Sequence, residues 1–176
     1  MQGHSYAWSG TGLLAYIDHR LVVALRERVG REASPTAGVI DSQSVKAAEC
    51  GGAGLDASKK NKGRKRRIVT ETEDFLVGVQ FHATDIQDRD GTPDLLASIR
   101  SPYPWLRHVF ADSGYSVDKP SDAMAPLGQW TFEIINRSDA AKHTFELLPR
   151  RWVVDRTFAW ILITHIRRLT RRLVQT

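Results

Sequence analysis

Three acidic side chains, far apart in the sequence, are the residues best suited to carry out chemistry. Asp41 and Asp112 each follow a short apolar run, and Asp155 lies inside a long helical pattern. Mg²⁺ takes oxygen ligands and is usually held by a few carboxylates together with phosphate and water. Two such ions, about 3.5–4 Å apart, can activate the attacking oxygen and stabilise the leaving oxygen in phosphoryl transfer. We therefore predict that the three acids are metal ligands and catalytic residues of one site.

Each acid also has a plainer interpretation. A single Asp at the edge of a strand, such as Asp41, is commonly a turn former or a solvated residue. Asp112 begins Asp-Ser-Gly, which has the composition of a turn, and Asp155 can form an (i, i+4) ion pair with Arg151. Only the combination favours a site. Two strand acids and a helix acid, with basic sequence between them, are the layout of a polynucleotidyl transferase with an RNase H-like fold.

A dense basic segment runs from Lys59 to Arg67, in which only Asn61 and Gly63 are uncharged. Such a charge density repels itself unless an anion neutralises it, and each neutralised phosphate releases counterions. We predict a loop that binds DNA in a strongly salt-dependent manner, the alternative being a solvated charge run. The predicted DNA contacts are Lys59, Lys60, Lys62, Arg64, Lys65, Arg66, Arg67 and Arg151.

The bulk composition agrees with a polyanionic partner. The formal charge is +5 and the pI about 9.6, and an excess of positive charge favours nucleic acid over acidic partners. The single cysteine, Cys50, excludes an internal disulfide. No window reaches the roughly 18 apolar residues of a membrane span, and the N-terminus does not resemble a signal peptide. We predict a cytoplasmic, nucleoid-associated protein with no membrane partner.

The acids need a sheet to position them, and the sequence predicts one. The predicted strands are the one carrying Asp41, a hairpin over 67–72 and 75–83, and runs over 105–111 and 130–136. The predicted helices cover 13–29, 92–100, 121–127 and 151–168. Parallel neighbouring strands would bring Asp41 and Asp112 together although 71 positions separate them. The expected fold class is α/β, an RNase H-like mixed sheet with flanking helices.

The first predicted helix is amphipathic. Ile17, Leu21, Leu25 and Val29 recur every four residues and form one face. Arg20, Arg26 and Arg28 lie off this face, where they are solvated or touch DNA. We expect residues 1–36 to form an N-terminal lead and this helix, and residues 37–176 to form the catalytic domain.

Several segments of the chain occur in the order of a known family. They are Ala37 to Lys46, Lys59 to Val69, Asp85 to Gly91, Val109 to Tyr115 and Arg151 to Trp160. Together they resemble the DDE transposases of bacterial insertion sequences, in particular the insertion-sequence-five group. The segments around Asp41, Asp112 and Asp155 are similar to those that bear the family's first, second and third catalytic acids. The resemblance implies an RNase H-like catalytic domain, dependence on Mg²⁺ or Mn²⁺, and cut-and-join chemistry on terminal inverted repeats of double-stranded DNA.

Two departures from the family pattern bear on activity. The family has Glu where this chain has Asp155, and one methylene less withdraws the carboxylate by roughly 1.5 Å. A misplacement of about 1 Å can cost on the order of 10²-fold in rate, so we expect weakened catalysis. The family also usually has an N-terminal helical DNA-binding region, and Ile161 to His165 stand where polar and basic residues are usual. We therefore expect an N-terminally truncated chain, with a homo-oligomer or an upstream-frame polypeptide as further partners.

Three hypotheses stay open at this point. The chain is an active DNA transposase, a catalytically weakened or inactive DNA-binding remnant of one, or an RNase H-like nuclease that acts on RNA–DNA hybrids. His82, His108 and His143 have no metal-ligand spacing, and we expect them to be structural or on the surface.

Overall fold

Six strands of the chain form one mixed sheet. The computed structural model describes residues 12–46, 54–56, 61–88, 90–115, 128–135 and 153–160. In chain order the elements are α2 (Leu13–Arg28), β1 (Ala37–Lys46), β2 (Gly54–Asp56), β3 (Asn61–Glu71), β4 (Leu76–Ala83), α3 (Thr92–Arg100), β5 (His108–Ala111), the 3₁₀ turn η1 (Ser113–Tyr115) and β6 (Thr131–Ile134). Residues 153–160 form a further helix.

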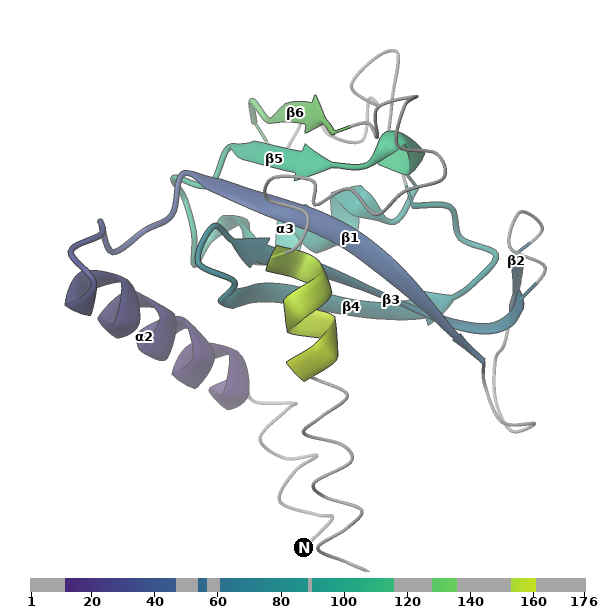
Figure 1. Ribbon diagram of the computed structural model, residues 1–176, viewed down its shortest axis with the longest axis horizontal. Coiled ribbons are helices and arrows are strands. Elements are labelled where there is room, and N and C mark those ends of the chain that lie inside the picture. The colour runs from purple at the N-terminus through teal and green to yellow at the C-terminus, as the bar shows by residue number, and fades with distance from the viewer. Residues whose placement is uncertain are drawn as a thin grey trace, which may run out of the picture.

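The strand order confirms the predicted fold class. β1 lies inside the sheet, antiparallel to β3 and parallel to β5. On the far side of β3 lies β4, which is antiparallel to it, and β6 continues the sheet parallel to β5 (Figure 1). An antiparallel set of three strands, followed by parallel strands added on the other side of the first, is the arrangement of an RNase H-like sheet.

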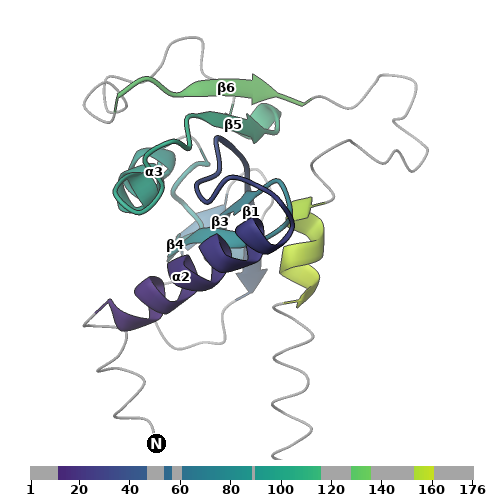
Figure 2. The same ribbon diagram turned by 90° about the vertical axis from the view of Figure 1, so that its left-hand side faces the viewer.

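Helices cover both faces of this sheet. Ile40 and Val69 belong to a core cluster with Leu95, Leu96 and Ile99 of α3. On the opposite face, Val39, Ile68 and Phe110 pack against Val154 and Phe158 of the helix at 153–160. Neighbouring strand residues point to opposite faces, which is why Val39 and Ile40 belong to different clusters. Figure 2 shows α3 and the helix at 153–160 on either side of the sheet.

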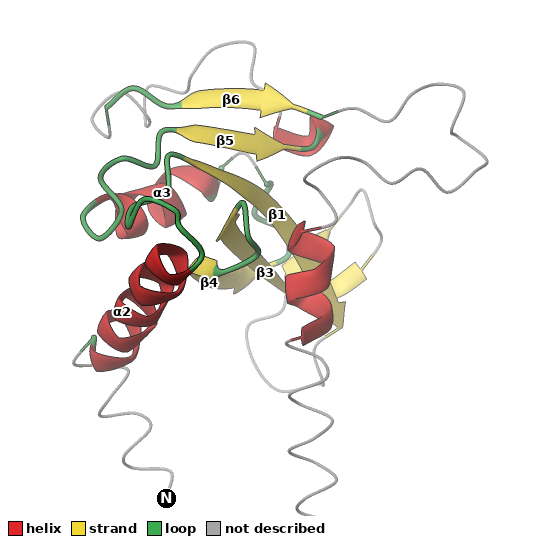
Figure 3. Ribbon diagram, turned by 60° about the vertical axis from the view of Figure 1, so that its left-hand side comes forward, coloured by secondary structure: helices red, strands yellow, loops and turns green. Residues whose placement is uncertain are grey.

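The predicted helix at 13–29 is confirmed as α2, but it packs through a different face from its apolar stripe. Leu21 and Val29 are 57% and 61% exposed, whereas Val22 and Arg26 are buried. Arg26 forms an ion pair with the buried Glu71 at the end of β3. The expectation that Arg26 is solvated or touches DNA is therefore wrong, because the helix lies against β4 and the turn that precedes it (Figure 3).

The basic segment is a strand and not a loop. Residues 61–71 form β3, which pairs with β1 on one side and β4 on the other. Backbone pairing on both edges outweighs the poor strand propensity of its charged residues. The predicted helices at 92–100 and 151–168 are present where described, the latter over 153–160. The predicted helix at 121–127 lies outside the described residues. None of the helices that the structure describes is long and apolar enough to cross a membrane.

Candidate active site

Asp41 lies on β1, and Asp112 directly follows β5, the parallel neighbour of β1. Each paired residue of β1 faces the residue 71 positions later in β5, from Ala37 with His108 to Val39 with Phe110. Asp112 follows Asp41 at the same interval. Two steps along a strand return a side chain to the same face, so the pleat places the Asp41 side chain on the face of Val39, and Asp112 is two residues beyond Phe110, which lies on that face. The parallel pairing thus brings the chain segments that carry the two acids side by side.

A backbone amide orients each of these carboxylates. The amide of Ser42 donates to Asp41 Oδ1 at 2.7 Å, and the amide of Gly114, within the 3₁₀ turn, donates to Asp112 Oδ1 at 2.9 Å. Hydrogen bonds between a backbone N–H and an ionised carboxylate are among the stronger ones in proteins. Each carboxylate is therefore oriented by a backbone amide close to it in the chain, Asp41 within β1 and Asp112 at the 3₁₀ turn.

Asp155 lies on the same side of the sheet but is not gathered into a cluster with the other two. Its helix packs on Val39 and Phe110 through Val154 and Phe158, and the Asp155 side chain is exposed. Among the residues that the structure describes, no group of three or more His, Cys, Asp or Glu side chains could hold a metal ion. Asp41 and Asp112 provide oxygen donors of the kind that Mg²⁺ takes, so two of the three proposed ligands fit such an ion.

The basic residues of β3 divide between the two faces of the sheet. Lys65 and Arg67 point to the α3 side, where Lys65 Nζ lies 3.0 Å and Arg67 Nη2 lies 3.7 Å from Asp88 Oδ1. Their side chains are 4% and 0% exposed, which does not fit the predicted contact with DNA phosphates. Arg64 is exposed and Arg66 half-buried on the face of Asp41. Lys59, Lys60, Arg151 and the side chain of Lys62 lie outside the described residues.

Arg66 connects the strand of Asp41 to the helix of Asp155. Its Nε donates to Gln43 Oε1 at 2.8 Å, and its guanidinium lies over the ring of Phe158, 5.0 Å from the centroid. Burial lowers the pKa of the Arg66 guanidinium from its ordinary value, yet an arginine remains charged at physiological pH. The residue thus places a positive charge on the face of the proposed acids.

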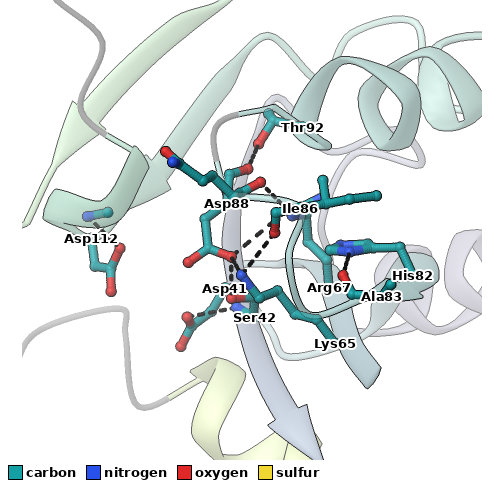
Figure 4. A network of polar contacts seen from close by, with 12 residues as sticks. Asp41, Ser42, Lys65, Arg67, His82, Ala83, Ile86, Asp88, Thr92 and Asp112 are labelled. Carbon is teal, nitrogen blue, oxygen red and sulfur yellow. Dashed lines mark hydrogen bonds and ion pairs between the residues drawn. The ribbon is translucent and has the colours of Figure 1, made fainter. Parts of the chain in front are cut away.

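Asp88 is a member of the site region that sequence reasoning missed. It lies in the loop between β4 and α3 and binds the hydroxyl of Ser42 in addition to the two buried cations (Figure 4). The loop is fastened to β3, since Lys65 Nζ donates to the carbonyl of Ile86 and Arg67 Nη2 to that of Gln87. The resemblance of Asp85 to Gly91 to a known family was the only signal that could have pointed to it.

Two further titratable side chains face this region. Burial raises the pKa of the Tyr115 hydroxyl well above its ordinary value, and the charges of Asp88 and Asp41 raise it further. Burial also lowers the pKa of the His82 imidazole, with Arg67 and Lys65 adding to the effect. Tyr115 is therefore neutral at physiological pH.

The sheet, α3 and the helix at 153–160 fall within one sequence family, whereas α2 precedes the matched residues. Residues 32–175 match the family model described as the transposase DDE domain. The chain belongs to this family. Transposase DDE domains are enzymes of the polynucleotidyl transferase type and typically work with a divalent metal. None of the curated proteins matches the chain.

Solved structures of two transposases are similar to this DDE domain. One is the piggyBac transposase synaptic complex with hairpin DNA, at 13% identity and a TM-score of 0.35 over 60% of this chain and 24% of that chain. The other is the Drosophila P element transposase strand transfer complex, at 14% identity and a TM-score of 0.31 over 57% of this chain and 26% of that one. The chain spans about a quarter of the length of each. The family assignment rests on the sequence model.

Proposed function

We propose that this DDE domain is the catalytic domain, residues 37–176, of a DNA transposase that cleaves and joins strands at the inverted repeats of an insertion sequence. The observation that carries the proposal is the parallel pairing of β1 with β5, because Asp41 lies two residues beyond the paired part of β1 and Asp112 is the residue that follows β5. Neighbouring strands lie about 4.8 Å apart, and two carboxylates at that spacing repel each other unless a cation lies between them.

The roles of the individual residues follow from where they lie. Asp41 and Asp112, with Asp155 from the helix, would hold Mg²⁺ or Mn²⁺. When bound, these ions activate the attacking oxygen and stabilise the leaving oxygen of a phosphodiester. The amides of Ser42 and Gly114 keep the two strand carboxylates aimed at that place.

Double-stranded DNA, at the transposon ends and at the target, is the proposed partner. Arg64 and Arg66 lie on the same face as Asp41, so their charges would attract the phosphate backbone toward the acids. We propose that Lys59, Lys60, Lys62 and Arg151 also contact DNA phosphates. We further propose that the protein is associated with the nucleoid. The homo-oligomer and the upstream-frame polypeptide stay predictions.

The Asp at position 155 is proposed to limit the rate. Its carboxylate is roughly 1.5 Å shorter in reach than that of Glu. Val154 and Phe158 are packed into the core on either side of it, and this packing keeps the helix from moving inward to compensate. Asp155→Glu should therefore raise activity by up to about 10²-fold.

Strand cleavage by the purified chain tests the function. Duplexes that carry the ends of the element are incubated with the protein and Mg²⁺ or Mn²⁺, beside RNA–DNA hybrids and duplexes of unrelated sequence. We expect nicking at the element's ends that Asp41→Ala and Asp112→Ala abolish while salt-sensitive DNA binding persists. The enzyme proposal fails if both the wild-type chain and Asp155→Glu leave the ends uncut. Selective cutting of the hybrids would favour the RNase H-like nuclease.

A further inference from the structure

Asp88 is a carboxylate that the proposed mechanism does not use, although one hydroxyl and two cationic groups converge on one of its oxygens. Ser42 Oγ lies 2.6 Å from Asp88 Oδ1, and the same oxygen faces Lys65 Nζ at 3.0 Å and Arg67 Nη2 at 3.7 Å. The Asp88 side chain is only 18% exposed. In an interior of low dielectric, such charge-assisted contacts are strong and reinforce one another. Asp88 is therefore held in one position.

Ser42 links this position to the first proposed catalytic acid. Its hydroxyl donates to Asp88 Oδ1, and its amide donates to Asp41 Oδ1 at 2.7 Å. Because Ser42 and Asp41 are neighbours on a strand, their side chains point to opposite faces. Asp88 thus binds β1 on the α3 face of the sheet. It does so through Ser42, the residue whose amide orients Asp41 on the opposite face.

The other oxygen of Asp88 lies toward the second proposed catalytic acid. A methyl group in place of a Gly114 α-hydrogen would lie 3.6 Å from Asp88 Oδ2 and 3.0 Å from Asp112 Oδ1. Gly114 is also the residue whose amide donates to Asp112 Oδ1 at 2.9 Å. Asp88 therefore bonds the side chain of Ser42 with one oxygen and turns the other toward Gly114, the two residues whose amides orient the carboxylates of Asp41 and Asp112.

We propose that Asp88 is a positioning residue that fixes the separation of the Asp41 and Asp112 carboxylates through Ser42 on one side and the Gly114 turn on the other. It also pairs with the buried Lys65 and Arg67 of β3. The inference rests on the proposed function of Asp41 and Asp112, and it adds a residue outside the three predicted acids.

A purely structural role makes a different prediction. If Asp88 served only as the counter-ion of Lys65 and Arg67, Ser42→Ala would leave both ion pairs in place, and its effect would be confined to Tyr115, whose hydroxyl also contacts Ser42. If Asp88 positions the acids, removing the Ser42 hydroxyl loosens Asp88, and the effect reaches Gly114 in the 3₁₀ turn after β5. Ser42→Ala is therefore the deciding variant, and Asp88→Asn is the direct one.

The first measurement needs no metal and no DNA. ¹H–¹⁵N spectra of the full chain are recorded for the wild type, Ser42→Ala, Asp88→Asn and the control Asp85→Asn, which changes an exposed carboxylate of the same loop. We expect the Gly114 amide resonance to move in Ser42→Ala and Asp88→Asn, and to stay in place in Asp85→Asn. An unmoved Gly114 amide in Ser42→Ala and Asp88→Asn overturns the proposal. Should Asp88→Asn not fold, the result for Ser42→Ala decides alone.

The second measurement is titration of the same proteins with Mn²⁺ alone. Loss of a group that supports metal ligands typically weakens metal affinity about 10–100-fold. We expect a weakening of that order in Asp88→Asn, a smaller one in Ser42→Ala and wild-type affinity in Asp85→Asn. Wild-type Mn²⁺ binding that Asp41→Ala leaves unchanged would instead contradict the proposed metal site. The Gly114 resonance would then still decide the role of Asp88.

Discussion

The guanidinium of Arg66 lies 5.0 Å from the ring centroid of Phe158. Arg66 belongs to β3 and also donates to Gln43, two residues after Asp41 on β1. Phe158 belongs to the helix that carries Asp155, three residues further along. One arginine therefore ties the strand of the first proposed acid to the helix of the third. A cation over an aromatic face contributes about 0.5–1 kcal/mol at exposed sites and more when desolvated.

Arg66→Lys should distinguish the effect of the contacts with Phe158 and Gln43 from the effect of the positive charge. Lysine keeps the positive charge that attracts phosphate but loses the planar fork that bonds Gln43 and stacks on a ring. We expect DNA affinity and its salt dependence to change little, while the cleavage rate falls. Thermal unfolding of Arg66→Lys, Phe158→Leu and the double variant should give a coupling of about 0.5–1 kcal/mol. Arg64→Lys, an exposed neighbour on the same face, is the control, and equal effects at both positions would contradict the tie.

The buried ion pair of Arg26 and Glu71 connects α2 to the sheet. Glu71 is fully buried; it accepts from Arg26 and from the amides of Glu73 and Phe75. Removing one partner of a buried pair leaves an uncompensated charge and costs about 3–5 kcal/mol. We expect Arg26→Met and Glu71→Gln to lower the free energy of unfolding by that order in urea titrations. Glu73→Gln, which breaks the exposed pair of Arg31 and Glu73, should cost no more than about 1 kcal/mol. Similar losses of unfolding free energy in Glu71→Gln and Glu73→Gln would show that the buried pair stabilises the fold no more than the exposed pair does.

The strands of the sheet could be predicted from the sequence because local patterns mark them, and the expected parallel pairing of the strands next to Asp41 and Asp112 is confirmed. Apolar runs mark β1 and β5, and two adjacent parallel strands necessarily bring their equivalent residues together. The start of α3 at Thr92, with Pro93 in its first turn, is also a local signal. The α/β class followed from these elements alone.

The course of the basic segment could not be predicted, because its structure depends on distant partners. Lys65 and Arg67 tolerate burial only since Asp88, more than 20 positions away, neutralises them from another loop. The alternation that sends Arg66 to the opposite face follows from pairing with β1 and β4. Likewise, the ion pair of Arg26 and Glu71 overrides the apolar stripe of α2. Tertiary partners at this distance leave no periodic signal.

His82 should make the stability of the fold depend on pH. Burial lowers the pKa of its imidazole below the ordinary 6.5, and the charges of Arg67 and Lys65 lower it further, whereas the Ala83 carbonyl and Asp88 oppose the shift. As pH falls below about 6.5 the unfolded chain binds a proton that the folded chain does not, so stability decreases until the folded pKa is reached. Melting temperatures between pH 7.5 and 5 should therefore fall less steeply in His82→Gln than in the wild type. Parallel curves would mean that His82 does not contribute.

Gly91→Ala should disturb the buried cations of β3 without straining the backbone. The φ of Gly91 is −90°, which alanine adopts freely, but a β-carbon there would lie 2.0 Å from Arg67 Nη1. Arg67 must then leave its place beside Gln87 and Asp88, and overpacking of this kind typically costs about 1–3 kcal/mol. The shorter lysine in Arg67→Lys leaves room for the methyl group, so adding Gly91→Ala to that background should cost much less than in the wild type. Urea unfolding of the two single variants and the double variant measures the difference. Strict additivity would mean that the methyl group is accommodated by moving the loop instead of Arg67.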